Sequence, residues 1–375
     1  MRYLDEFRDP ALARQLIDRI RRLATRRWTL MEVCGGQTHS LLRHGIDLEL
    51  EDVVELLHGP GCPVCVTPAE EIDLACQLAR QPGVLVSSFG DMLRVPGRQS
   101  SLLEARRAGG RVQLVYSPLD AVELARRDPS RLVVFLAVGF ETTVPATALA
   151  VLQAAELGLA NFRVLTAHVR VLPAMEVIAQ DPTSRVQAFL AAGHVCTVAG
   201  HRVYDSFCEH HRLPVVVTGF EPVDLLEGIA ECVLQLERGE AHVVNAYRRS
   251  VRPTGNEAGQ QLIERVYTVS DVPWRGLGVI PAGGYQLRPE FAWCDARSLL
   301  EGSRESSGDD HHECPAREVL LGRIRPSECP HFGGRCRPET PLGAPMVSGE
   351  GCCAAHYRYG RRIDESRAKC EGEPS

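Results

Sequence analysis

The sequence lacks the long apolar segments of membrane-bound and secreted proteins. It contains no run of about 18 apolar residues, the length that a helix needs to cross a bilayer. Its N-terminus, MRYLDEFRD, has no apolar core of the kind found in signal peptides. We therefore expect a cytoplasmic protein that has no membrane partner.

An excess of positive charge is missing as well. Lysine and arginine total 42 against 48 acidic residues, a net charge of −6, which argues against a nucleic-acid partner. No P-loop, complete dinucleotide fingerprint or serine nucleophile elbow is present. These absences argue against a nucleotide-driven enzyme and an ordinary hydrolase, and they leave open whether the protein is an enzyme.

What is present indicates an α/β protein. The 375 residues suggest two or three domains. The first thirty residues have the apolar spacing of a helix. Short β-branched runs then recur at intervals that fit a strand, a helix and two loops, which predicts parallel sheets. The predicted strands are 84–87, 112–116, 132–138, 162–167, 195–199 and 214–218. A serine N-cap and a proline at 117–118 predict a helix start.

An apolar strand that ends in Gly-Phe-Glu occurs twice, at 139–141 and 219–221. We interpret this repeat as two similar α/β domains that face each other across a central cleft at the carboxyl ends of their strands, where sites form in open sheets. After about residue 270, Pro, Gly and Cys become dense, and 301–312 is expected to be an exposed polar loop. The expected division is a helical segment 1–28, α/β domains 29–145 and 146–268, and a C-terminal domain 269–375.

Fourteen cysteines are many for a protein of a reducing compartment, where disulfide frameworks are rare. Five of them stand singly and are expected to be buried apolar filler. These five are Cys76, Cys196, Cys208, Cys232 and Cys294.

A C-terminal group of cysteines has the number of thiolates that a metal centre needs. Cys314, Cys329, Cys336 and Cys353 are separated by 14, 6 and 16 residues, without the close pairs usual in structural zinc sites. A [4Fe–4S] cluster, zinc and no metal all remain possible on spacing alone, and the cluster is favoured. Of the adjacent Cys352 and Cys353, only one is expected to be a ligand.

Three further motifs carry candidate chemistry. Cys62 and Cys65 form a C-x-x-C pair on a stiff Pro/Gly loop, which favours a redox pair or a transient metal clamp over half a zinc site. Cys34 precedes two glycines in MEVCGGQTH, where its thiolate is expected to be accessible and His39 could supply an imidazole, although a structural turn is equally possible.

The third motif is Glu141-Thr142-Thr143 at a strand end. These side chains could bind a polar group or cap the following helix. His194 lies near another strand end, and a structural role is the better interpretation for any one such histidine.

At these residues the sequence resembles the HypD family of hydrogenase-maturation iron–sulfur proteins. The matching stretches are MEVCGGQTH (31–39), GPGCPVCVTP (59–68), GFETT (139–143), GHV (193–195), TGFEP (218–222) and CPHFGGRCRPETPLGAPMVSGEGCCAA (329–355). They are spread over almost the whole chain.

The resemblance implies a function and a fold. The family assembles the Fe(CN)2CO centre of [NiFe] hydrogenases, holding the iron with a small HypC-type chaperone while a HypE-type protein delivers cyanide. Its fold is two similar α/β domains plus a small helical and irregular iron–sulfur domain. The family's iron-site cysteine maps to Cys34 and its C-x-x-C pair to Cys62 and Cys65. Its [4Fe–4S] ligands map to Cys314, Cys329, Cys336 and Cys353.

Two positions depart from the family pattern. Gln37 replaces the usual histidine after Cys-Gly-Gly. If that histidine helps to hold iron or to move a proton in the family, this chain must use His39 for that task or lack it. Pro345 replaces a cysteine, but the four-ligand spacing survives. The alternatives are a free-standing thiol–disulfide oxidoreductase, which would need neither Cys34 nor iron, and an α/β enzyme with a structural zinc.

Overall fold

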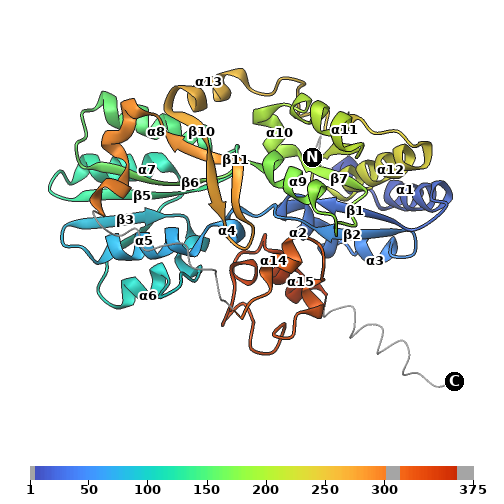
Figure 1. The fold of residues 1–375 in the computed structure, drawn as a ribbon, viewed down its shortest axis with the longest axis horizontal. Helices are drawn as coiled ribbons and strands as arrows, with labels where there is room; N and C mark the ends of the chain where they lie inside the picture. The colour runs from blue at the N-terminus through green and yellow to red at the C-terminus, as the bar shows by residue number, and fades with distance from the viewer. Residues whose placement is uncertain (1–4, 301–312, 361–375) are drawn as a thin grey trace. The chain divides into compact units, whose positions relative to one another are not determined.

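The computed structural model describes residues 5–300 and 313–360, so the loop expected at 301–312 lies outside the described residues (Figure 1). The chain forms two compact units. The first comprises Met1–Cys62, Met175–Gly255 and Cys314–Ser375, and the second comprises Pro63–Ala174 and Asn256–Glu313. Each unit is described below by itself.

The first unit is built on a five-stranded parallel sheet in the order β2-β1-β7-β8-β9. The strands are β1 Trp28–Glu32, β2 Val54–His58, β7 Ala188–Ala192, β8 Val215–Thr218 and β9 Val243–Asn245. Its helices are α1 Pro10–Leu23, α2 Gly35–Arg43, α3 Ile46–Glu49, α10 Gly193–Ala199, α11 Asp205–His211, α12 Pro222–Arg238, α14 Ala316–Leu320 and α15 Cys352–Tyr359, with α9 Val171–Gln180 at the border of the units.

Alternate strand residues of this sheet pack on helices. Leu30, Leu56 and Leu190 share one core cluster with Ile20 of α1 and Ile229 of α12. Phe189, which alternates with Leu190, instead meets Phe207 of α11 with ring centroids 5.6 Å apart. Because successive strand residues point to opposite faces, α11 covers the other side of the sheet.

The second unit contains a four-stranded parallel sheet in the order β4-β3-β5-β6 and a hairpin, β10-β11. The strands are β3 Val84–Ser88, β4 Val112–Leu114, β5 Leu132–Gly139, β6 Phe162–His168, β10 Tyr267–Trp274 and β11 Gly278–Leu287. The helices are α4 Pro63–Val66, α5 Ala69–Arg80, α6 Leu102–Arg107, α7 Pro118–Arg127, α8 Val144–Glu156 and α13 Glu257–Val266. Helix α5 packs on α6, and α7 packs on α8 (Figure 1).

The predicted fold class is confirmed, since each unit holds a parallel α/β sheet. The strands expected near 84, 112, 132, 162 and 214 are present, and Ser117 caps α7 in a capping box, as predicted. The five cysteines expected as filler are all buried. The two Gly-Phe-Glu motifs follow β5 and β8, one in each unit.

The strand predicted at 195–199 is wrong, because these residues form α10. The strand is the preceding Ala188–Ala192, whose residues are all buried. Its alanines have low β propensity, but burial on both faces of a parallel sheet decides the outcome. The helix expected over the first thirty residues ends at Leu23, and Trp28–Glu32 is a strand.

The C-terminal region is helical and irregular, and it is rich in cysteine. Helix α15 packs on α2 of the same unit (Figure 1). The Tyr359 hydroxyl lies 3.1 Å from His39 Nε2, and a Cβ on Gly35 would lie only 2.3 Å from the Glu350 carbonyl oxygen. This region is therefore part of the unit that holds Cys34.

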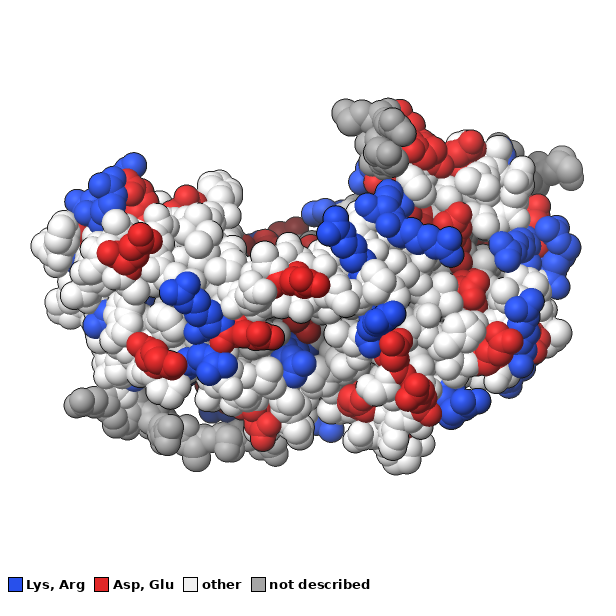
Figure 2. Space-filling view, turned by 90° about the horizontal axis from the view of Figure 1, so that it is seen from above, with Lys and Arg blue, Asp and Glu red and all other residues white. Residues whose placement is uncertain are grey.

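The described surface seen in Figure 2 carries acidic and basic side chains side by side, with uncharged surface between them. Such mixing keeps a protein soluble without concentrating charge of one sign. Among the described helices, none combines the length and the apolar composition that crossing a bilayer requires.

Candidate functional site

Cys34 lies where strand β1 passes into helix α2 and occupies the N-cap position of that helix. Its side chain is buried, with 2% of its surface exposed. The prediction that this thiol is accessible is therefore wrong. Burial raises the pKa of the Cys34 thiol, and the nearby carboxylates of Glu32 and Glu350 add to the rise. The thiol is therefore protonated near pH 7.

His194 is a side-chain partner of that thiol, with Nδ1 3.6 Å from Cys34 Sγ. It stands at the start of α10, just after β7 ends. Burial lowers the pKa of His194 to about 4, so its imidazole is neutral near pH 7. Phe220 stacks on the ring at 5.3 Å and fixes its orientation. A thiol and a neutral imidazole are both ligands that iron accepts.

Glycine brings the loop of Cys62 against Cys34. A Cβ on Gly61 would lie 2.1 Å from the Cys34 backbone nitrogen, so only glycine permits this approach. The Gly35 N–H also donates to the Gly61 carbonyl at 3.0 Å. Because Cys62 follows Gly61 directly, the Cys34 and Cys62 loops lie side by side in the first unit.

Cys62 and Cys65 are both disulfide-bonded in the structure. Both side chains are buried, and Cys65 belongs to the short helix α4. The pair is thus able to form a disulfide on this loop, which is the covalent change that a redox role needs.

A buried carboxylate, Glu32, holds the Cys34 loop. Its Oε2 accepts the Cys34 N–H at 2.8 Å, while Oε1 accepts the Thr38 hydroxyl and lies 2.8 Å from His58 Nδ1. Burial opposes the charge on His58, but the Glu32 carboxylate outweighs it and raises the pKa of His58. Each oxygen of the Glu32 carboxyl group thus has a hydrogen-bond partner, as a polar group in the interior requires.

The sequence analysis did not predict Glu32 and His58 as site residues, although their positions at strand ends could have indicated them. Each is the last residue of an apolar parallel strand, and the two are register partners on β1 and β2. Ionisable residues that end neighbouring parallel strands meet at one edge of the sheet. That rule predicts the pair from TLME and ELLH.

Gln37 and His39 both point to structural partners. The Gln37 amide, fully buried, donates to the Ala191 carbonyl at 3.1 Å and to Thr218 Oγ1 at 2.6 Å. It thereby ties α2 to the ends of β7 and β8. The His39 ring meets the Tyr359 ring edge-on, with centroids 5.1 Å apart.

The four C-terminal cysteines predicted as ligands line one small pocket of about 20 Å³, together with Pro345 and Phe332. The Leu342 N–H points at Cys336 Sγ, 3.4 Å away. A Cβ on Gly343 would lie 2.4 Å from Cys314 Sγ. Four thiols, an apolar wall and a backbone N–H to sulfur suit an iron–sulfur cluster chemically. Among the residues that the structure describes, no three His, Cys, Asp or Glu side chains are arranged to hold a metal ion.

Cys353 and Cys352 have different surroundings. Cys353 lines the four-cysteine pocket and Cys352 does not. The Cys352 thiol, together with burial and the neighbouring Cys314 and Cys336 sulfurs, raises the pKa of Cys353. Hydrogen bonding to Cys353 and the nearby His58 lower the pKa of Cys352. The pocket lining thus includes Cys353, the one of the two adjacent cysteines that the sequence analysis assigned to the four-cysteine set.

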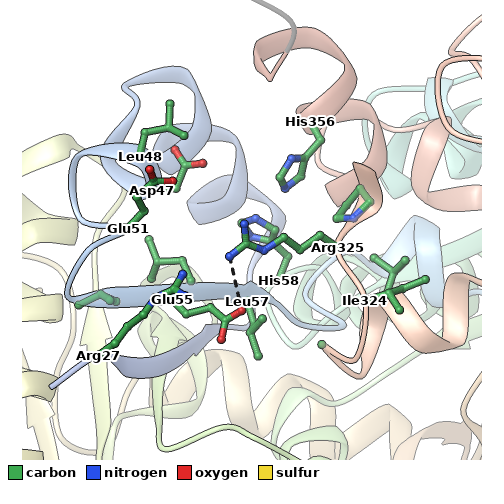
Figure 3. A pocket seen from close by; sticks show the side chains of 15 residues that line it. Arg27, Asp47, Leu48, Glu51, Glu55, Leu57, His58, Ile324, Arg325 and His356 are labelled. Carbon is green, nitrogen blue, oxygen red and sulfur yellow. Dashed lines mark hydrogen bonds and ion pairs between the residues drawn. The ribbon is translucent and has the colours of Figure 1, made fainter. Parts of the chain in front are cut away.

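A cavity of about 50 Å³ with polar and apolar walls lies between β2 and the C-terminal segment within the first unit (Figure 3). His58 and Glu55 of β2 face Arg325 and His356 across it, and Arg325 lies 3.4 Å from Glu55. The His58 and His356 rings meet edge-on with centroids 4.9 Å apart. Helix α15 is therefore held next to the Glu32–His58 pair.

The Glu141-Thr142-Thr143 motif lies in the second unit, and only its Glu141 side chain bonds to the start of a helix. Glu141 Oε1 accepts the N–H of Val171, the first residue of α9, at 3.1 Å. Thr143 is the N-cap residue of α8, but its hydroxyl donates to the Phe140 carbonyl and makes no capping bond. Burial raises the pKa of Glu141 to about 7.

Comparison of the sequence with known proteins identifies the family to which this chain belongs. The family model of HypD, described as the hydrogenase formation hypA family, matches residues 11–360. The chain belongs to the HypD family. It is 43% identical to the hydrogenase maturation factor HypD of Escherichia coli K12, over 98% of this chain and 100% of that protein. It is 46% identical to that of Azotobacter vinelandii, over 96% of this chain and 98% of that protein.

The relative from Rhodobacter capsulatus, 43% identical over 96% of this chain, is also a hydrogenase maturation factor HypD. Family membership over nearly the full length supports a role in hydrogenase maturation. The cysteine sites above are the parts of the chain whose chemistry suits such a role.

Proposed function

We propose that this protein is a scaffold on which the Fe(CN)2CO centre of [NiFe] hydrogenases is assembled. The iron is its cargo, and Cys34 is the residue that binds it. The observation that carries the proposal is the placement of the Cys34 thiol 3.6 Å from a neutral His194 and beside the Cys62 loop. Soft thiolate and imidazole donors suit an iron that carries strong-field ligands.

The surroundings of Cys34 fit a temporary site. Burial disfavours the free thiolate, so the thiol gives up its proton only when a cation arrives. Glu32 holds the Cys34 amide and thereby sets the direction of the thiol. Phe220 covers the imidazole and keeps water from this side of the site.

Cys62 and Cys65 either complete the coordination of the cargo iron or act as a two-electron store. Forming a disulfide from two thiols releases two electrons and two protons, and reopening it takes them up. The disulfide-bonded state of both residues supports the second role.

Cys314, Cys329, Cys336 and Cys353 would hold a resident [4Fe–4S] cluster. When bound, such a cluster supplies one-electron transfer. The Leu342 N–H would hydrogen-bond to the ligand sulfur of Cys336, and Pro345 and Phe332 would shield the site from water.

The partners that follow are a HypC-type chaperone, which shares the iron, and a HypE-type cyanide donor. A thiol–disulfide oxidoreductase remains a second candidate, favoured by the disulfide-bonded C-x-x-C pair alone. The two functions differ at Cys34, since an oxidoreductase has no use for that thiol.

The Cys34→Ala variant tests the proposal. We expect anaerobically purified variant protein with its chaperone to lose the cyanide and carbonyl infrared bands and to fail in hydrogenase maturation. The variant should keep its fold and its cluster iron and sulfide, because none of the four pocket cysteines is changed.

Cys208→Ala is the matched control, since Cys208 is also buried but lies in α11. It should keep the infrared bands. Bands of normal intensity in the Cys34→Ala variant would show that iron is held elsewhere. Unimpaired dithiol exchange in a protein that never binds iron would favour the oxidoreductase.

A further inference from the structure

The second unit contains a polar cavity of about 390 Å³ that no cysteine lines. It is formed by the end of β6, the first turn of α5, the β10-β11 hairpin and the 3₁₀ turn that follows Asp295. Its volume is in the range of pockets that hold small molecules. Its lining shares no residue with the cysteine sites described above.

The cavity exists because the edge strand β6 is only partly covered. On its outer side, β6 and the residue after it meet other segments through two isolated bridges, Val164 with Asp295 and Val169 with Gly284. A Cβ on Gly284 would lie 2.5 Å from the His168 carbonyl oxygen, so glycine lets the hairpin approach there. Between the two bridges the strand faces the cavity instead of a partner strand.

The charges around the cavity are unbalanced. Three carboxylates line it, those of Glu71, Asp271 and Asp295, against the single guanidinium of Arg297. Arg297 Nη2 is already engaged by Glu71 Oε1 at 2.6 Å and by the Thr166 carbonyl at 2.9 Å. His168 adds no charge, because burial lowers its pKa to about 4. The lining thus holds three carboxyl groups against one guanidinium, and burial raises the pKa of one of these groups, that of Glu71.

Glu71 carries an acceptor without a donor. The residue is 9% exposed, and its buried Oε2 has no hydrogen-bond partner among the described residues. A buried acceptor without a partner is costly, and an N–H group from a ligand would satisfy it. The remaining walls are largely apolar, including Val272, Pro273, Leu287 and the ring of Tyr285.

We propose that this cavity binds a small organic cation, with an ammonium or guanidinium group on a short apolar stem. The cationic group lies among the carboxylates of Glu71, Asp271 and Asp295 and donates to Glu71. The stem lies against the apolar wall that includes Val272, Pro273 and Leu287. The carboxylates are not arranged to share one metal ion among the described residues, which separates this site from a metal site.

Butylguanidinium and butylamine serve as probes, and butylurea is the neutral control with the shape of butylguanidinium. Saturation-transfer NMR titrations on the full-length protein at pH 7.5 give the dissociation constants. We expect both cations to bind at least about tenfold more tightly than butylurea, the ratio typical of one charge-assisted hydrogen bond.

Two variants locate the binding. Glu71→Gln removes the carboxylate whose Oε2 lacks a partner, and Asp271→Asn removes a charge while keeping the acceptor for the Ala282 N–H. Each should weaken cation binding about tenfold or more. The Glu123→Gln variant, which removes a carboxylate from the exposed face of α7, should bind the cations normally. Circular dichroism confirms that each variant is folded.

Three results would overturn the proposal. Butylurea could bind as tightly as butylguanidinium, which would make the site merely apolar. The two cavity variants could bind the cations with unchanged dissociation constants, which would mean that the cations bind outside this cavity. Inorganic phosphate or Mn²⁺ could displace butylguanidinium competitively, which would make the cavity an anion site on Arg297 or a metal site.

Discussion

Gln37 is a buried polar side chain whose hydrogen bonds join neighbouring elements of the first unit. It stands directly after Cys34-Gly-Gly, where the resemblance to the family led us to expect a histidine. Its amide is used for two hydrogen bonds to the ends of β7 and β8, and neither bond goes to the Cys34 thiol. The imidazole beside that thiol belongs to His194, from a distant part of the sequence. A structural role for Gln37 therefore accounts for its contacts.

Two substitutions at Gln37 separate its packing from its hydrogen bonds. Histidine keeps a donor, so Gln37→His should lower the free energy of unfolding by only about 1 kcal/mol. Leucine leaves the Ala191 carbonyl and Thr218 hydroxyl without the amide, so Gln37→Leu should cost roughly 2–3 kcal/mol. Urea unfolding measures both. An equal loss for the two variants would mean that shape alone matters there.

Helix α15 is the element that joins the two cysteine sites. It begins with Cys352 and Cys353, and it packs through His356 on His58 and through Tyr359 on His39. His58 in turn holds Glu32, which holds the Cys34 amide. One short helix thus connects the four-cysteine pocket mechanically to the Cys34 loop.

The two cysteines at the start of α15 should differ in their effect on the proposed [4Fe–4S] cluster. Cys353→Ser removes one of the four pocket thiols, so the anaerobic protein should lose its brown colour and most of its roughly four iron and four sulfide per chain. Cys352→Ser is the neighbouring control and should keep both. Iron and sulfide assays decide the matter, and a tightly bound zinc without sulfide would contradict the cluster.

The start of α9 depends on a carboxyl group that burial makes hard to ionise. Glu141 accepts the Val171 N–H, and burial raises its pKa from 4.5 to about 7. Between these two values the folded chain keeps a proton that the unfolded chain has released. The contribution of Glu141 to the free energy of unfolding therefore falls as the pH rises through this window.

The Glu141→Gln variant should remove that fall. Its amide oxygen still accepts the Val171 N–H, and it has no charge to bury, so at pH 8 it should be about 1–3 kcal/mol more stable than the parent protein. At pH 4.5 the two proteins should be nearly equal. Denaturant unfolding at a series of pH values tests this, and an unchanged pH slope would show that Glu141 ionises normally.

On the scale of the whole molecule, three segments far apart in the sequence make up the first unit, and the second unit is inserted between them. The chain leaves the first unit at Cys62, and Pro63 begins the second. The C-x-x-C pair therefore stands at a point where the chain passes from one unit to the other.

Thiol counting tests whether this pair alone changes oxidation state. The sequence has 14 cysteines, so the denatured, metal-free chain should show 14 thiols after reduction and 14 − 2 = 12 after mild oxidation. Peptide mapping should place the difference at Cys62 and Cys65. Two free thiols at this pair under mild oxidant, with no response to iron, would rule out the redox role.

The sequence by itself determined the α/β class, all four strands of the parallel sheet in the second unit, the cap of α7 and the family. These features rest on local signals: apolar runs, Ser-Pro caps and motifs of contiguous residues. It also singled out the four cysteines that line one pocket, because their spacing is written in the chain. Local signals failed at β7, where alanines form a buried central strand.

Only the tertiary structure decided which side chains meet. His194 reaches Cys34 from 160 residues away, Glu32 and His58 pair across neighbouring strands, and α15 packs on α2. The charge balance of the cavity in the second unit also depends on Glu71 and Arg297, 226 residues apart. Burial and long-range packing set these contacts and the pKa shifts that follow from them, and neither quantity is encoded in any single stretch of residues.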